Sequence, residues 1–222
     1  MVSIPSMLRW LIPGSLKRSL VRVIRQIAAD EIRRSQLPTM IWGYQSPDGF
    51  RAQTRLSNTV YVYHPERVHI ADNVFVWHHS ILDGTGGIEI GEGCQIGAWV
   101  GIFTHSSHKA IRIYGRHYTD VAEDEKEFYV VKKIKIGKYV FIGAGAKILP
   151  GVTIGDGALI GAGALVRESV PPFAIVEGSP AQVVGSTETL DKRALKSEKF
   201  RTWYDQWQET NMTEVVSANL PE

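Results

Sequence analysis

The chain has 222 residues, of which 44% are hydrophobic and 22% are charged, with one cysteine and a formal net charge of +2. This composition excludes a disordered chain and an intrachain disulfide, and so small a charge does not indicate a nucleic-acid partner. A membrane span is not predicted, because no apolar run reaches about 18 residues. Nor is a secretory signal, because the short apolar stretch 7–13 precedes basic residues instead of following them.

Residues 1–59 are predicted to form an N-terminal flank. Within it, residues 15–34 have the pattern of an amphipathic helix, with Ser15 as its N-cap and an apolar stripe on one side. We expect this helix to pack on its own chain or on a neighbouring subunit. Its basic side leaves open a peripheral contact with the cytoplasmic face of a membrane. Residues 43–59 are expected to be a connecting region with a turn at 46–49.

A six-residue repeat dominates the middle of the chain. An aliphatic residue returns at every sixth position, and a small or β-branched residue follows four positions later; the aliphatic positions include Ile136, Ile142, Ile148, Ile154, Ile160 and Val166. The same phase occurs earlier, from Ile70 to Leu82 and from Ile90 to Ile102. Neither the period of a strand nor that of a helix explains six. The pattern predicts a prism-like β-coil in which three short strands complete one turn. Cys94 occupies a small inward position and is expected to be a core thiol.

The repeat is interrupted once and ends before the C-terminus. Residues 106–133 break the phase and are too many for a corner, so they are predicted to form a long loop that carries function. The β-coil is expected to span residues 60–185. Residues 186–222 are expected to form a helical cap, rich in aromatic and charged residues over 188–210, and a tail.

The segment from Phe141 to Val166, followed by Gly178 to Val184, resembles the C-terminal coils of the hexapeptide-repeat acyltransferases, including the maltose, galactoside and xenobiotic acetyltransferases. The resemblance covers roughly residues 66–185. It implies an all-β core folded as a left-handed parallel β-helix, a homotrimer, and acetyl-CoA as the acyl donor without a metal.

Acyl transfer to a hydroxyl group needs a base, and histidine is the usual one. His105 and His108 lie where the coil gives way to the long loop. In the xenobiotic branch the catalytic histidine stands six positions after the last in-phase aliphatic residue, which corresponds to His108. His108 is therefore the first choice and His105 the second. Four histidines in two pairs would also be compatible with a metal site, but their spacing matches no familiar ligand motif.

The resemblance also suggests acceptor and donor residues. Asp83 stands where sugar acetyltransferases have an aspartate, and it is expected to orient either the acceptor or the histidine; His79 is a second candidate for the acceptor site. The family's pantetheine groove, which lies between neighbouring subunits, corresponds to Gly143, Ala144 and Ala162. The basic candidates for the phosphates of CoA are Lys147 and Arg167. Gln182 stands where the family usually has a basic residue, which removes one expected phosphate contact.

Together these features predict a cytoplasmic O-acetyltransferase that acts on a sugar hydroxyl, in a cell-surface polysaccharide or lipopolysaccharide component. Three alternatives remain open at this point. They are N-acetylation of an amino sugar, acetylation of a drug, and a non-catalytic or zinc-dependent β-helix protein.

Overall fold

The computed structural model describes residues 20–28 and 37–204, and it divides into two units, 1–39 and 40–222. In the first unit residues 20–28 are helical, which agrees with the helix predicted over 15–34; the rest of that prediction lies outside the described residues. The apolar side chains of this helix are exposed, namely Leu20, Val21, Val23, Ile24 and Ile27. None of the described helices is long and apolar enough to cross a membrane.

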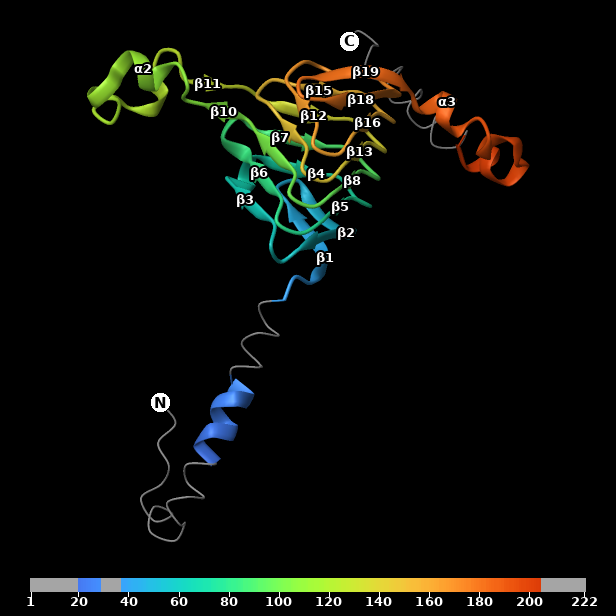
Figure 1. Ribbon diagram of the computed structural model, residues 1–222, viewed down its shortest axis with the longest axis horizontal. Helices are drawn as coiled ribbons and strands as arrows, with labels where there is room; N and C mark the ends of the chain where they lie inside the picture. Colours follow the sequence, from blue (N-terminus) through green and yellow to red (C-terminus); the bar gives the residue numbers. More distant parts are fainter. Residues whose placement is uncertain (1–19, 29–36, 205–222) are drawn as a thin grey trace. The chain divides into compact units, whose positions relative to one another are not determined.

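The second unit is a parallel β-coil with three faces (Figure 1). The eight-stranded face contains, in spatial order, β1 (Met40–Ser46), β2 (Gly49–Ser57), β5 (Phe75–Val76), β8 (Gln95–Ile96), β13 (Phe141–Ile142), β16 (Leu159–Ile160), β18 (Ala174–Gly178) and β19 (Ala181–Ser186). The five-stranded face contains β17 (Leu165–Val166), β14 (Lys147–Ile148), β9 (Gly101–Phe103), β6 (Ile81–Asp83) and β3 (Tyr61–Tyr63). The four-stranded face contains β15 (Thr153–Ile154), β12 (Ile134–Ile136), β7 (Ile88–Ile90) and β4 (Val68–Ile70).

The strand register explains the six-residue period. Ile142 pairs with Ile160, and Ile148 pairs with Val166, so one turn of the coil contains three repeats. The repeated aliphatic side chains point inward and stack as a continuous buried core, in which Ile142, Ile148 and Ile160 have no exposed surface. Burial of these apolar side chains is the main term that stabilises the coil.

Cys94 belongs to this core, as predicted. Its side chain is fully buried and its Sγ lies 3.0 Å from the carbonyl oxygen of Gly137. Burial raises the pKa of the Cys94 thiol to about 12, so the thiol stays protonated and is not a nucleophile.

The N-terminal end of the coil differs from the expected connecting region. Residues 40–57 form an antiparallel hairpin, β1–β2, whose second strand pairs with β5. The predicted turn does lie in this hairpin, because Ser46 pairs with Gly49. At the other end β19 folds back antiparallel on β18. Antiparallel strands thus form both edges of the eight-stranded face.

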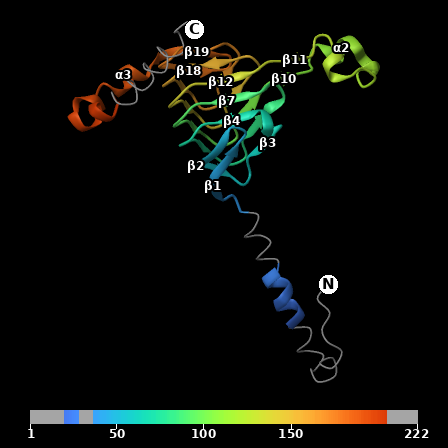
Figure 2. The same cartoon turned by 180° about the vertical axis from the view of Figure 1, so that it is seen from behind.

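The long loop is an arm on a two-stranded stalk. Strand β10 (His105–Ser106) pairs antiparallel with β11 (Val130–Val131), and between them lie α2 (Ala110–Tyr114), η4 (Gly115–His117) and η5 (Glu123–Glu125). The arm leads away from the coil, and α3 (Thr187–Asp191) leaves the coil near its C-terminal end (Figures 1 and 2). The remaining short helices are η2 (Pro65–Arg67), η3 (Gly84–Gly86) and η6 (Ala194–Lys196).

Candidate active site

The stalk of the arm borders a cavity of about 430 Å³. It lies at the corner between the five-stranded and four-stranded faces, where the arm begins and where Pro150 and Arg167 form the corners of the next two turns. Its lining residues are Phe103, His105, Ser106, His108, Val130, Leu149, Pro150 and Arg167. Both histidines proposed as the base are therefore in one cavity, together with a cation.

Asp83 connects this cavity to the core. It ends strand β6, and its side chain is almost completely buried. Its Oδ2 lies 2.6 Å from Nδ1 of His105 and accepts the backbone N–H of Thr104 at 2.9 Å. Its Oδ1 accepts the hydroxyl of Thr85 at 2.6 Å and the backbone N–H of Thr85 at 3.1 Å. Four contacts of 3.1 Å or less, and a longer one from the hydroxyl of Thr104 to Oδ2 at 3.2 Å, thus fix the orientation of this carboxylate.

These contacts also decide the charge of Asp83. Burial alone would raise the pKa of the carboxyl group, but hydrogen bonds from Thr85, Thr104 and His105 outweigh it and lower the pKa of Asp83 below its ordinary value. The group is therefore ionised at neutral pH and can only accept hydrogen bonds. Nδ1 of His105 must then donate to it, so Nε2 is the ring nitrogen that can accept a proton.

Tyr129 provides a further contact to His105. The two ring centroids lie 5.8 Å apart and the planes are tilted by 48°. Tyr129 precedes β11, so the returning strand of the stalk brings its ring against a histidine on the outgoing strand. Sequence analysis did not identify Tyr129, Thr85 or Thr104, and none of them belongs to a motif that could have revealed it.

His108 lies in the same cavity in a different environment. Its Nδ1 is 2.8 Å from the hydroxyl oxygen of Ser106, and its carbonyl oxygen accepts a hydrogen bond from Arg112 at 2.6 Å. The carboxylate of Asp83 contacts His105 and not His108. The geometry therefore favours His105 over the residue that the family spacing favoured.

His79, the second acceptor candidate, is placed elsewhere. It precedes β6, whereas Asp83 ends that strand. Its ring stacks on Trp99 with centroids 6.3 Å apart, and its backbone N–H donates to the hydroxyl of Thr59. The structure therefore does not bring His79 to Asp83 and His105.

The candidate donor residues fall into two places. Gly143, Ala144 and Ala162 follow β13 and β16, at the corner between the eight-stranded and five-stranded faces. A Cβ on Gly143 would lie 2.5 Å from the backbone nitrogen of Ala162, so successive turns pack here without room for a side chain. Nζ of Lys147 donates to two carbonyl groups at this corner, those of Trp99 and Gly145. Arg167 instead lines the cavity of His105.

A metal site built by this chain alone has no support in the described residues, since no three His, Cys, Asp or Glu side chains among them are grouped to hold an ion.

Residues 133–168 match the family model of the bacterial transferase hexapeptide, six repeats. The regular turns of this coil are thus similar to the hexapeptide repeats of bacterial transferases. The all-β fold of the coil is the left-handed parallel β-helix that the sequence predicted. The family model covers the regular turns that follow the arm, and the corner of Asp83 and His105 precedes it.

Three known proteins are similar to this hexapeptide coil. Nodulation protein L of Rhizobium meliloti (strain 1021) is 39% identical over 118 residues, which are 53% of this chain and 59% of that protein. A hexapeptide-repeat containing acetyltransferase from Vibrio cholerae has a TM-score of 0.51 and 27% identity, with 59% of this chain and 69% of that one covered. A galactoside acetyltransferase in complex with coenzyme A has a TM-score of 0.50 and 28% identity, with 60% of this chain and 62% of that one covered.

Proposed function

We propose that this protein transfers the acetyl group of acetyl-CoA to a hydroxyl group of a sugar, with His105 as the general base. The observation that carries the proposal is the hydrogen bond between the ionised, buried Asp83 and His105, whose ring lines a cavity. A base oriented by a carboxylate and open to a substrate-sized space is what direct acyl transfer needs. The similarity to solved acetyltransferases supports the same reaction class.

The reaction requires little else from the protein. Nε2 of His105 accepts the proton of the acceptor hydroxyl as that oxygen attacks the thioester carbonyl carbon. Asp83 stabilises the imidazolium that forms, because its negative carboxylate accepts the hydrogen bond from Nδ1–H. When the carbon–sulfur bond breaks, Nε2 returns the proton to the departing thiolate. The products are the acetyl ester and the free thiol, so no covalent enzyme intermediate is needed.

The donor is proposed to lie along the corner of Gly143, Ala144 and Ala162, where Ala144 and Ala162 are exposed. The strands of the five-stranded face begin at this corner and end at the corner of His105. The two corners are therefore separated by the width of that face, and a single chain does not bring them together. A second subunit can bring its own donor corner to His105, which supports a closed homotrimer. Arg167, which lines the cavity of His105, is then available to bind either a phosphate group of CoA or the acceptor.

The acceptor is proposed to be a sugar in a cell-surface polysaccharide or lipopolysaccharide precursor. The same base could equally deprotonate an ammonium group, so an amino sugar is the nearest alternative acceptor. The galactoside acetyltransferase similarity favours a hydroxyl group.

A thiol-release assay tests this function directly. The purified full-length chain is incubated with acetyl-CoA and a panel of neutral sugars, amino sugars and drug-like hydroxyl compounds, and free CoA is measured. We expect release that depends on a neutral sugar and persists in the presence of a chelator. Release only with amino sugars would change the acceptor class. A complete lack of release with every acceptor, together with a requirement for zinc in another reaction, would contradict the proposal.

A further inference from the structure

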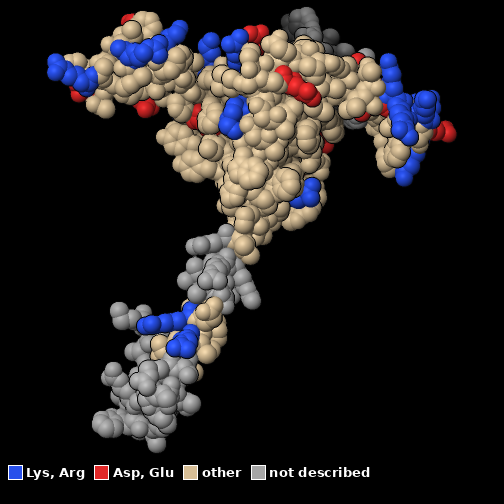
Figure 3. Space-filling view, viewed as in Figure 1, with Lys and Arg blue, Asp and Glu red and all other residues tan. Residues whose placement is uncertain are grey.

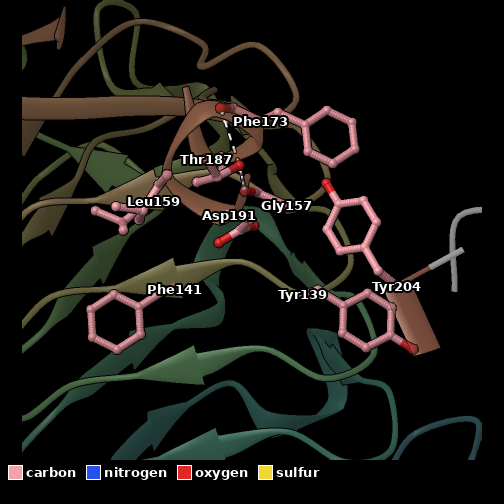
Figure 4. A pocket seen from close by; sticks show the side chains of 10 residues that line it. Tyr139, Phe141, Gly157, Leu159, Phe173, Thr187, Asp191 and Tyr204 are labelled. Atoms are coloured by element: carbon pink, nitrogen blue, oxygen red, sulfur yellow. Dashed lines mark hydrogen bonds between the residues drawn. The ribbon is translucent and has the colours of Figure 1, made fainter. Parts of the chain in front are cut away.

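The segment that follows the coil has a composition unlike that of the coil. It consists of α3, η6 and the helical residues 198–204. Its first turn is attached to the coil, because Thr187 donates its backbone N–H to the carbonyl of Phe173 at 2.8 Å and its hydroxyl to that of Gly157 at 2.9 Å. At the far end Tyr204 lines a cavity with Phe173 and Tyr139 of the coil (Figure 4).

Basic side chains are concentrated between these two attachment points. Between Thr187 and Tyr204 there are five basic residues, Lys192, Arg193, Lys196, Lys199 and Arg201, and three acidic ones, Glu188, Asp191 and Glu198. All five basic residues are exposed. They form the dense group of cations over this segment in the space-filling view, where most of the coil surface carries few charges (Figure 3).

Large apolar side chains are exposed among these cations. Leu190 is 62% exposed, Phe200 47% and Trp203 55%. Phe200 and Trp203 line a hollow of about 350 Å³ together with Asp191, Ala194, Leu195 and Tyr204. Nζ of Lys199 lies 4.7 Å from the centroid of the Trp203 ring. We call the exposed set the basic–aromatic patch; it consists of Leu190, Lys192, Arg193, Lys196, Lys199, Phe200, Arg201 and Trp203.

We propose that the basic–aromatic patch docks the protein on a membrane surface rich in anionic lipids. Such a surface has negatively charged headgroups that complement the five cations. Beneath them is the boundary region in which tryptophan and phenylalanine rings are stabilised. A second copy of the same patch would not be a suitable partner, because it would place cations against cations. The proposal concerns location and is independent of the acetyl-transfer chemistry.

Co-sedimentation with vesicles tests the docking. The full chain is mixed with vesicles of phosphatidylcholine alone and with vesicles that contain phosphatidylglycerol, at low and at high salt. We expect binding to the anionic vesicles only, weakened by salt because the headgroup attraction is screened. Lys192→Gln with Lys196→Gln should weaken binding roughly 30-fold, since each basic residue near an anionic surface contributes about fivefold.

Two matched variants show whether the patch itself is responsible. Lys133→Gln with Lys135→Gln removes the same charge from the four-stranded face, and Arg22→Gln with Arg25→Gln removes it from the N-terminal helix; both should retain binding. Phe200→Ala with Trp203→Ala should weaken binding at low and high salt alike. Thermal unfolding confirms that each variant is folded.

Four results would overturn the proposal. Equal binding to both vesicle types would show that anionic lipid is not required. An equal loss of vesicle binding in the Lys192 and Lys196 variant and in either matched variant would show that the patch is not responsible. A smaller sedimenting species for the Phe200 and Trp203 variant, with vesicle binding unchanged, assigns the face to a second copy. Binding to single-stranded DNA without binding to vesicles assigns it to nucleic acid.

Discussion

Two regions of the coil differ in what they bury: the regular turns after the arm, residues 134–176, and the corner at which the arm interrupts the repeat, where Asp83, Thr104 and His105 lie. From Ile134 to Val176 the buried side chains are all apolar. At the interrupted corner Asp83 and Thr104 are buried, and Asp83 retains its charge. A buried carboxylate is costly unless every lone pair is used, and here four hydrogen bonds use them. The regular turns therefore contribute stability through their apolar core. The corner at which the repeat is interrupted instead positions the charged carboxylate of Asp83 next to His105.

The largest effect expected from this comparison is the loss of the base at the interrupted corner. His105→Ala should lower kcat by about 10²–10⁴-fold, because it removes the group that accepts the acceptor proton. His108→Ala removes an exposed ring from the same cavity that is not bonded to Asp83, so it should lower kcat by less than about tenfold. Thiol release under saturating acetyl-CoA measures both.

The two histidines are matched controls for each other, since they share a cavity and differ in the partner of Nδ1. Thermal unfolding of each variant should stay close to that of the unmodified protein. A large loss with His108→Ala and a small one with His105→Ala would transfer the role of the base to His108 and separate it from the buried carboxylate.

The regular turns should respond in stability instead of catalysis. Ile160→Ala truncates a fully buried side chain in the stack, and such a truncation typically costs about 2–5 kcal/mol of unfolding free energy. Ile113→Ala, which shortens a 65% exposed side chain in the arm, should change that free energy by less than about 0.5 kcal/mol. Urea unfolding followed by circular dichroism distinguishes the two. A similar cost for both would mean that the arm is packed in the assembled protein.

The difference between regular and irregular regions also explains which parts of the fold the sequence could predict. A period of six over Ile136 to Val166 specifies the three-faced coil, because each repeat has one inward position and the faces close after three repeats. The hairpin β1–β2 was not predicted, since its strands carry no six-residue phase and are recognised only through their pairing with β5.

The sequence predicted which corner of the coil carries the site, but not how the side chains at that corner contact one another. Asp83, His105 and His108 were identified from motifs, but the choice between the histidines depends on where two side chains point. Thr104 and Asp83 are 21 positions apart in sequence, and no local pattern shows that adjacent turns bring them into contact. Tyr129 reaches His105 only because the arm returns as β11, which depends on the antiparallel pairing of the stalk.

The smallest effect expected at the interrupted corner is on the pH dependence of stability. Asp83→Asn keeps the shape of the side chain, but an amide cannot accept all the hydrogen bonds that the carboxylate accepts. At pH 7 the variant should lose about 1–3 kcal/mol of unfolding free energy. Because the pKa of Asp83 is lower in the folded protein than in the unfolded chain, its contribution is fully present above the unfolded value of about 3.9 and is lost as the pH falls through the folded value.

The difference in unfolding free energy between the unmodified protein and Asp83→Asn should therefore shrink as the pH falls below about pH 4. Urea unfolding at a series of pH values measures it, and Asp120→Asn provides a control, since that side chain is mostly exposed and lies in the arm. A difference that stays constant into the acid range would mean that the charge of Asp83 does not stabilise the fold. The carboxylate would then act on His105 through its shape alone, and Asp83→Asn should retain most of the acetyl-transfer activity.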